Sequence, residues 1–454
     1  MRSKNKFSEW LNQRSPVQLI IIFYIIAVTV SCLLLGMPVA HKDGADLTFM
    51  EVLFTSVSAV SVTGLSVVSI VDSFNQLGIV LLAVVLQFGG VGVMTLGTFI
   101  WLVVGKKIGL KERRLIMADQ NQYSFNGIVK LMKGVFKLIL WIELVGFLIL
   151  GTYYLTYFSS WQEAYFHGFF ASISATTNGG FDITGQSLMP FKDDYFVQII
   201  HIALIIFGSI GFPVLVEVKD YLFASQEERK FMRFSLFTKV TSITYLGLLI
   251  FGFVIMIALE WNHFYADKSW HEMIFYSLFQ STTSRSGGLS TFDMNLLTEQ
   301  TQLVTSLLMF IGASPSSVGG GIRTTTFALV IIFILTFARG KSKVSVFKRE
   351  IFEEDLYKAV VVVLMAVGLC ITAVVLLTII EDSSLVAIIF EVCSAFGTTG
   401  LSMGITAELT NISKVILMVL MFIGRIGILT LLFSFNDVTK KGEFHYPKEK
   451  IIIG

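Results

Sequence analysis

Four short stretches of small and hydroxyl-bearing residues end in a glycine turn and recur along the chain. They read SAVSVTGLS (58–66), SATTNGGFD (174–182), TTSRSGGLS (282–290) and SAFGTTGLS (394–402), and the first and last agree at six of nine positions. Glycine allows backbone angles that are closed to other residues, so carbonyl oxygens can be turned toward one point. A ring of such oxygens can replace the water shell of a cation. The residue types therefore predict cation coordination by backbone rather than catalysis by side chains.

The spacing of the four stretches indicates an internal repeat. A glycine falls at the seventh position of each stretch, and these glycines are separated by 116, 108 and 112 residues. The alternative interpretation, a glycine-rich extracellular turn, explains one such stretch better than four at nearly equal period. The predicted selectivity-filter residues are Val62, Thr63, Gly64, Asn178, Gly179, Gly180, Ser286, Gly287, Gly288, Thr398, Thr399 and Gly400.

The elements that must position these stretches are apolar helices of two lengths. With 54% hydrophobic and only 15% charged residues, the chain is too apolar for a soluble globule. A span needs roughly 20 apolar residues, which predicts eight transmembrane helices near 17–40, 77–104, 138–158, 195–216, 240–259, 303–338 (interrupted), 359–380 and 415–435. Four shorter runs, too short to cross, are predicted pore helices near 49–62, 164–177, 272–283 and 385–397.

The basic residues predict how these helices are oriented. Of 34 lysines and arginines, 27 fall in the two ends of the chain and in segments 105–137, 219–239 and 339–358, which are therefore expected to be cytoplasmic. Each long-short-long unit then begins and ends inside. The prediction is an all-α, multi-pass cell-membrane protein with four parallel M1-P-M2 repeats around a pseudo-fourfold pore and with cytoplasmic N- and C-termini. The expected boundaries are 1–104, 105–219, 220–338 and 339–435 for the repeats and 436–454 for a cytoplasmic tail.

The turns of the four units read T-G-L, N-G-G-F, S-G-G-L and T-T-G-L. With these turns, the chain resembles the Trk/Ktr/HKT superfamily of potassium transporters over about residues 17–435, and within it the Ktr membrane subunit most closely. The resemblance implies potassium at Gly64, Gly180, Gly288 and Gly400, sodium as an activator in many members, and no covalent cofactor. It also implies a homodimer on a cytosolic RCK-type regulatory ring, similar to KtrA or KtrC, which would carry ATP or ADP in place of this chain. A first-repeat serine is associated with sodium in relatives, whereas this chain has Gly64. Thr176 and Thr177 depart from the pattern of relatives.

An interrupted run in the third repeat, FIGASPSSVGGGIRTTTFAL (310–329), is expected to break its helix in the membrane, whereas the other second spans are expected to be continuous. Freed backbone groups need water or protein partners, so the segment is predicted to border the pore. In the resembled family, a loop here and an arginine in the fourth repeat obstruct the pathway. We therefore expect residues 313–322 to form a movable plug. The predicted gate residues are Ser314, Ser316, Ser317, Gly319, Gly320, Gly321 and Arg425.

Other residues have competing interpretations. The stretch QFGGVGVMTLG (87–97) is similar to a dinucleotide-binding fingerprint, but its place inside an uncharged run favours helix packing. Glu143 and His201 lie in predicted spans, where a structural hydrogen bond and a functional role both remain open. Arg285 is expected to brace the filter from behind. No catalytic constellation is evident, so neither an enzyme nor a nucleic-acid partner is expected. The alternatives to a potassium-selective channel-like pathway are a sodium-permeable version of it and an alternating-access transporter.

Overall fold

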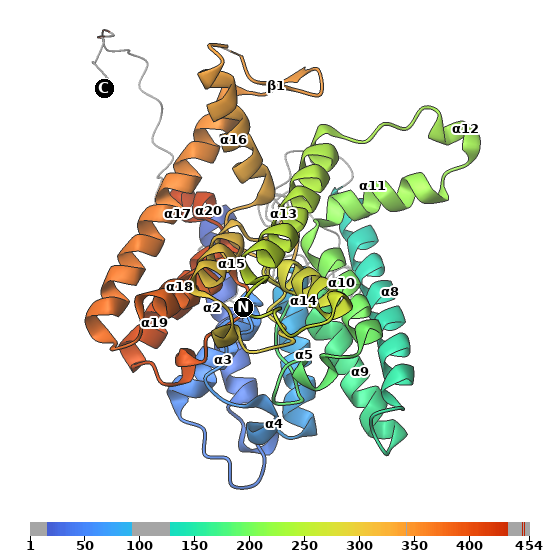
Figure 1. Ribbon diagram of the computed structural model, residues 1–454, viewed down its shortest axis with the longest axis vertical. Helices are drawn as coiled ribbons and strands as arrows, with labels where there is room; N and C mark the ends of the chain where they lie inside the picture. The colour runs from blue at the N-terminus through green and yellow to red at the C-terminus, as the bar shows by residue number, and fades with distance from the viewer. Residues whose placement is uncertain (1–15, 93–127, 342, 435–446, 448, 450–454) are drawn as a thin grey trace, which may run out of the picture.

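The computed structural model describes residues 16–92, 128–341, 343–434, 447 and 449, and this part of the chain is almost entirely helical (Figure 1). Four helices are long and apolar enough to cross a membrane, and they coincide with predicted first spans. In Figure 1, α8 lies along one side of the molecule and α17 along the other. These four helices are α2 (Pro16–Leu35), α8 (Ile128–Tyr154), α13 (Leu236–Glu260) and α17 (Glu353–Ile380).

The four shorter apolar runs also form helices, as predicted, and these lie inside the protein. Polar residues cap their first turns: the hydroxyl of Thr48 and the carboxylate of Glu51 form a capping box, as do Ser269 and Glu272. The last turns are buried, so each helix ends in the protein interior within one of the glycine stretches. The helices are α3 (Phe49–Ser61), α9 (Trp161–Thr176), α14 (Trp270–Thr283) and α18 (Leu385–Gly397).

The predicted second spans break more widely than expected. The expectation that only the third is interrupted is wrong, because α5 ends at Gly92, α10 ends before Gly211 and α19 ends at Gly427. At α10 and α11 the chain turns by 107°. The helices are α5 (Gln76–Val91), α10 (Tyr195–Ser209) and α11 (Phe212–Phe223), α15 (Glu299–Ile311) and α16 (Thr324–Ala338), and α19 (Asn411–Ile426) and α20 (Ile428–Ser434). The remainder of predicted span 77–104 lies outside the described residues.

Short elements connect the helices at both ends. A two-residue hairpin, β1 (Ser345–Val346) and β2 (Arg349–Glu350), is antiparallel and pairs Val346 with Arg349. It lies at the same end as α12 (Gln226–Arg229), which extends sideways beyond α11 (Figure 1). The other short helices are η1 (Pro38–Ala40), α4 (Ile70–Ser73), η2 (Met189–Phe191), η3 (Met294–Leu296) and η4 (Ile405–Ala407).

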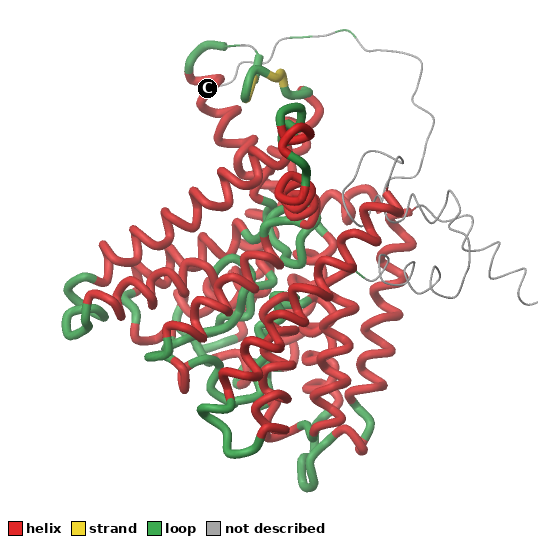
Figure 2. The backbone as a smooth tube through the Cα atoms, turned by 90° about the vertical axis from the view of Figure 1, so that its right-hand side faces the viewer, coloured by secondary structure: helices red, strands yellow, loops and turns green. Residues whose placement is uncertain are grey.

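The short buried helices and the broken helices pack in a closed cycle. Helix α5 packs on α9, α10 on α14, α15 on α18, and α19 returns to α3. Each broken helix therefore contacts the short helix of the next unit, and the last contact joins the C-terminal part of the chain to its N-terminal part. Non-helical backbone lies in the middle of this arrangement as well as at its ends (Figure 2). The four glycine stretches occupy this central region.

Candidate ion pathway

The four glycines at the seventh position of the stretches meet at one place. A Cβ atom built on Gly64 would lie 2.8 Å from the Cα of Gly180, and one on Gly180 would lie 3.0 Å from the Cα of Gly288. A Cβ on Gly288 would lie 3.4 Å from the Cα of Gly400, and one on Gly400 would lie 3.1 Å from the Cα of Gly64. All four have positive φ, between 66° and 95°. The structure thus brings together residues more than 330 positions apart and leaves no room for side chains between them.

Carbonyl oxygens of the residues just before the glycines face this meeting point. A Cβ on the neighbouring glycine would lie 2.3, 2.6 and 2.4 Å from the carbonyl oxygens of Thr63, Gly179 and Thr399, respectively. The side chains of Thr63 and Thr399 are buried, whereas Gly64 and Gly400 are partly exposed. The surface that the stretches present at their centre is therefore backbone.

Residues two positions before the glycines adopt a left-handed conformation. This conformation is costly for residues with a side chain, and most of all for a β-branched one. Such strain persists only where surrounding contacts impose it, and it gathers at functional sites. The four residues, with φ from 47° to 70°, are Val62, Asn178, Ser286 and Thr398.

The backbone amides of the stretches are bonded to the short helices behind them. The amide of Thr63 donates to the carbonyl of Ser58 at 2.8 Å, and that of Gly64 donates to the Ser58 hydroxyl at 3.1 Å. The same pair of contacts joins Thr399 and Gly400 to Ser394, at 2.9 and 3.1 Å. Because the N–H groups are occupied behind the turn, the carbonyl groups remain available at its front.

The second and third stretches differ from these in their side-chain contacts, although the amide of Gly179 donates to the carbonyl of Ser174 at 2.6 Å as that of Thr63 does to Ser58. Here a helix hydroxyl donates to the carbonyl that follows the glycine: Ser174 Oγ to Phe181 at 2.5 Å and Thr283 Oγ1 to Leu289 at 2.6 Å. Each half of the ring therefore contains two adjacent stretches with the same side-chain anchoring. The first and last stretches, which share one anchoring, also agree at six of nine sequence positions.

The loop of residues 312–323, between α15 and α16, lies directly against two of the glycine stretches. The amide of Gly320 donates to the Thr398 hydroxyl at 2.7 Å. A Cβ on Gly319 would lie 2.5 Å from the Ser286 hydroxyl oxygen. Ser314, Ser316 and Ser317 are buried. The structure thus brings the predicted gate segment together with the predicted filter residues.

Backbone hydrogen bonds fasten the same loop to the bend between α10 and α11. Ser314 donates to the carbonyl of Ser209 at 3.0 Å, and Val318 donates to that of Gly208 at 3.1 Å. The amide of Phe212, the first residue of α11, donates to the Ser316 carbonyl at 2.8 Å. These bonds satisfy amides and carbonyls that the broken helix leaves without intrahelical partners.

Two arginines donate hydrogen bonds to carbonyl groups of the loop. Arg425 of α19 donates to the carbonyl of Val318 in the loop and to that of Gly89 in α5, as expected for a cation in a predicted span that faces an interior partner and not lipid. Arg323 donates to the carbonyl of Gly319. The sequence interpretation did not assign Arg323 to the gate, although a charge at the end of the interrupted run was a usable signal.

The breaks in the other second spans follow a motif that the sequence interpretation missed. Gly-Gly-Val-Gly (89–92), Gly-Ser-Ile-Gly (208–211) and Gly-Arg-Ile-Gly (424–427) share the pattern G-x-[VI]-G. The last glycine of each has φ between 91° and 102° and lies at the break: Gly92 and Gly427 follow the ends of α5 and α19, and Gly211 precedes the start of α11. The first glycine packs on the last turn of a short helix. A comparison of the second spans with each other would have found this pattern. The first of the three motifs belongs to the stretch QFGGVGVMTLG, whose residues 93–97 lie outside the described residues.

Alanine at the first glycine of this motif is expected to destabilise the protein. A Cβ on Gly424 would lie 1.9 Å from the carbonyl oxygen of Phe396, closer than atoms can approach. We expect Gly424→Ala to lower the free energy of unfolding by about 1–3 kcal/mol, measured by thermal unfolding of the purified protein. Gly368→Ala is the matched control, because Gly368 lies in α17 with nothing within 4 Å of the added atom. Equal stability of the two variants would contradict the close packing.

Several buried polar residues flank the ring. Glu391 in α18, which the sequence interpretation missed, accepts hydrogen bonds from the Ser402 hydroxyl at 2.6 Å and the Met403 amide at 3.0 Å. A carboxylate inside an otherwise apolar short helix was the signal in the sequence that could have identified Glu391.

The Nδ1 of His201 contacts its own helix at the Val197 carbonyl, 2.8 Å away, which is a structural hydrogen bond. One carboxylate oxygen of Glu143 has no partner among the described residues.

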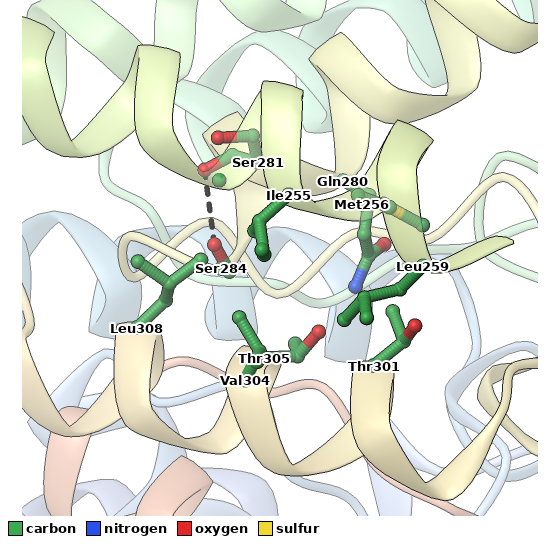
Figure 3. A pocket seen from close by; sticks show the side chains of 11 residues that line it. Ile255, Met256, Leu259, Gln280, Ser281, Ser284, Thr301, Val304, Thr305 and Leu308 are labelled. Atoms are coloured by element: carbon green, nitrogen blue, oxygen red, sulfur yellow. Dashed lines mark hydrogen bonds between the residues drawn. The ribbon is translucent and has the colours of Figure 1, made fainter. Parts of the chain in front are cut away.

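A small cavity lined by apolar and polar side chains lies behind the third stretch (Figure 3). Gln280 of α14 reaches into the space between Leu259 of α13 and Thr301 of α15. The cavity encloses about 10 Å³, which is enough for roughly one water molecule. Its size excludes an organic substrate, so the central backbone ring is the stronger candidate for a transport site.

Comparison with known proteins is consistent with this geometry. The chain matches the family TrkH, described as a cation transport protein, over residues 7–444. It is 61% identical over 449 residues to the Ktr system potassium uptake protein D of Bacillus subtilis, covering 99% of each chain. It is 32% identical over 448 residues to the potassium/sodium uptake protein NtpJ of Enterococcus hirae, covering 97% of each. A crystal structure of the potassium transporter TrkH from Vibrio parahaemolyticus has a similar fold, with a TM-score of 0.71, 17% identity, and coverage of 93% of this chain and 86% of that one.

Proposed function

Because this chain belongs to the TrkH family of cation transport proteins, we propose that it is a multi-pass membrane protein that takes up potassium through a channel-like pore. The relatives named above are transport proteins and not enzymes. The single observation that carries the channel-like proposal is the meeting of Gly64, Gly180, Gly288 and Gly400. Backbone carbonyls around this point are suited to replace the hydration shell of a potassium ion.

The closed cycle of helix contacts supports four M1-P-M2 repeats with eight spans and four pore helices, as proposed from the sequence. In this arrangement the short helices α3, α9, α14 and α18 point their C-terminal ends toward the ring. A helix C-terminus carries about half a negative charge, which favours cations there. The proposed repeat boundaries are those expected from the sequence, with both termini in the cytoplasm.

We further propose that the loop 312–323 is the gate. It lies against Ser286 and Thr398 of the proposed filter and is held by Arg425, whose charge would oppose a potassium ion passing below the ring. A static kink is the alternative. The loop is bonded to the first residue of α11, so a force applied to α11 would act on the loop through Phe212 and Ser316.

The proposed partners are a second copy of this chain and a cytosolic, nucleotide-binding RCK-type ring, with sodium as an activator. The name Ktr system of two relatives implies a system of several subunits. Helix α11 leads into segment 225–233, and α16 leads into segment 338–350 with its hairpin; both segments carry exposed basic residues. These segments are suitably placed to connect a cytosolic ring to the gate. The third basic segment, 105–114, lies outside the described residues.

Neutralising exposed basic residues in the two described segments is expected to weaken association with the ring. Two basic residues of these segments are left unchanged because they make contacts within the protein. Arg229 donates to the Tyr221 carbonyl, and Lys343 pairs with Glu350 at 2.9 Å. The variant therefore changes Lys230, Arg233, Arg339, Lys341, Lys348 and Arg349 to glutamine. We expect weaker co-purification with the ring and normal membrane insertion, because rim charges contribute to association more than to folding.

The control for this test changes basic residues on the proposed outer side. Lys42→Gln, Lys192→Gln and Lys268→Gln together remove charge without altering the proposed cytoplasmic face. Association with the ring should then be unchanged. If the cytoplasmic variant binds the ring as strongly as the control, the basic residues of these segments set the membrane orientation of the chain and do not bind the ring.

The experiment that tests the proposed function is ion uptake in cells that lack their own potassium systems. Expression of this chain with a regulatory ring should restore growth at low potassium and accelerate potassium uptake. A sodium-permeable pathway is the second candidate, because one relative is named a potassium/sodium uptake protein. Sodium uptake that equals potassium uptake would favour that candidate, and uptake of neither ion would contradict both.

A further inference from the structure

Arg285 is a fully buried cation whose place in the protein is not explained by ion binding. It lies in the third glycine stretch, one residue before Ser286, and its side chain is 0% exposed. No carboxylate lies within ion-pair distance of it in the part of the chain that the structure describes. Burying an unpaired charge is costly, so its contacts must compensate. The sequence predicted that Arg285 supports the filter from behind. That prediction does not say which group the guanidinium binds.

The contacts of Arg285 lead to the loop 312–323. Its Nη2 donates to the carbonyl of Gly312, the first residue of the loop, at 2.5 Å. Gly312 is also the residue at which α15 ends, with φ 57°. Helix ends present carbonyl groups without intrahelical partners and carry a partial negative charge, which a guanidinium complements. The strongest contact of this filter residue is therefore with the gate and not with the filter.

A second contact connects the same guanidinium to the bend that anchors the loop. The Arg285 guanidinium lies over the ring of Tyr245, 5.4 Å from its centre. The Tyr245 hydroxyl bonds to Ser209 Oγ at 2.6 Å, and the carbonyl of Ser209 accepts the amide of Ser314. A cation over an aromatic ring is attracted to its face, more strongly when water is excluded. Arg285 and Tyr245 thus grip the first residues of the loop from two directions.

We propose that Arg285 is a positioning residue that fixes the N-terminal end of the loop 312–323 to the third filter segment, so that the gate and the filter move together. The bond to Gly312 holds the loop closed, and displacement of the loop pulls on the segment that contains Ser286. This inference rests on the proposed function of the loop as a gate. It assigns Arg285 a role in gating. A residue that only supported the filter would not have this role.

The test measures access to the loop directly. Ser317→Cys places a thiol in the loop, in a chain whose three natural cysteines are replaced by alanine, and a charged thiol reagent is applied from the cytoplasmic side. Adding Arg285→Met removes the bond to Gly312, and we expect labelling of the new thiol to accelerate about tenfold, as the loss of a charge-assisted hydrogen bond implies. In intact chains, potassium flux through Arg285→Met should rise. The same substitution should add nothing to the flux of a chain that lacks residues 316–321.

Glu391→Gln is the matched control. Glu391 is a buried charged residue behind another filter segment, but it accepts its hydrogen bonds from Ser402, Met403 and Thr406 of the outer segment 402–406. Its substitution should leave labelling at position 317 unchanged, even if ion selectivity changes. A general loosening of the filter would instead accelerate labelling in both variants, and this result would overturn the proposal.

Further outcomes separate this inference from the proposed function. If the parent chain takes up potassium but Arg285→Met labels at the parental rate, Arg285 does not hold the loop. If the parent takes up no potassium, the proposed function fails whatever the labelling shows. If Arg285→Met does not reach the membrane, Arg285→Lys carries the test, and we expect it to label about threefold faster than the parent because an ammonium cannot reproduce the planar contact with Tyr245. A parental rate in that variant also overturns the proposal.

Discussion

Serine at any of the four central glycines is expected to reduce discrimination between potassium and sodium by about tenfold, because a side chain there displaces carbonyl oxygens of the ring, and a misplacement that costs about 1.4 kcal/mol is a tenfold change. The added Cβ also meets backbone of the neighbouring segment. Crowding is greatest at Gly400 and Gly288, where the added Cβ lies 2.3 and 2.4 Å from carbonyl oxygens, and least at Gly180, where its nearest neighbour is the Cα of Gly288 at 3.0 Å. Gly180→Ser should therefore be the mildest of the four. The measurement is the ratio of potassium to sodium uptake at equal amounts of protein in the membrane.

Gly404→Ser is the matched control for this series. Gly404 lies four residues beyond Gly400 and also has positive φ, 89°, but nothing lies within 4 Å of an added Cβ. The Gly404→Ser variant therefore has the free-energy cost of a positive φ, but its added Cβ does not collide with a neighbouring segment. We expect its ion selectivity to be that of the parent. If two or more of the four ring variants match Gly404→Ser, the glycines do not form a shared filter.

Removal of residues 316–321 is expected to raise potassium flux and to weaken its dependence on the regulatory ring. The deletion eliminates Val318 and Gly320, which bond to Gly208 and Thr398. Arg425→Ala should raise flux by about tenfold, because it removes a charge-assisted hydrogen bond from the loop. It should change selectivity little, since the hydrogen bonds of Arg425 go to the carbonyls of Val318 in the loop and of Gly89 and Gly90 in α5. Initial rates of potassium uptake, with and without the ring, measure both effects.

Lys414→Ala is the control for the arginine substitution. Lys414 lies on the same helix, α19, but its Nζ donates to the Ala407 carbonyl at the far end of that helix. Loss of this cation should leave flux unchanged, so a rise in both variants would point to a nonspecific effect of charge. A deletion variant that inserts normally, transports no faster and stays fully regulated would show that the loop 312–323 is a static kink.

The sequence by itself determined the first span and the short helix of each unit and the order of these helices. Hydrophobic run length and polar N-caps are local properties, and they correctly predicted α3, α9, α14 and α18 as short helices and placed the break between α15 and α16. The repeat of the glycine stretches predicted which residues would come together. Four similar segments that are predicted to enter from the same side are expected to bury their ends around a common centre.

Only the tertiary structure decided how the second spans and the buried arginines behave. A glycine within a helix costs only about 1 kcal/mol, which is too little to predict a break at Gly92, Gly211 or Gly427 from local sequence. The breaks occur where other segments supply partners for the freed backbone, as Ser316 does for Phe212. Likewise, the Gly312 carbonyl became the partner of Arg285 because two segments 27 residues apart pack together. Such contacts depend on which backbone groups a neighbouring segment leaves unbonded, and no local pattern records that.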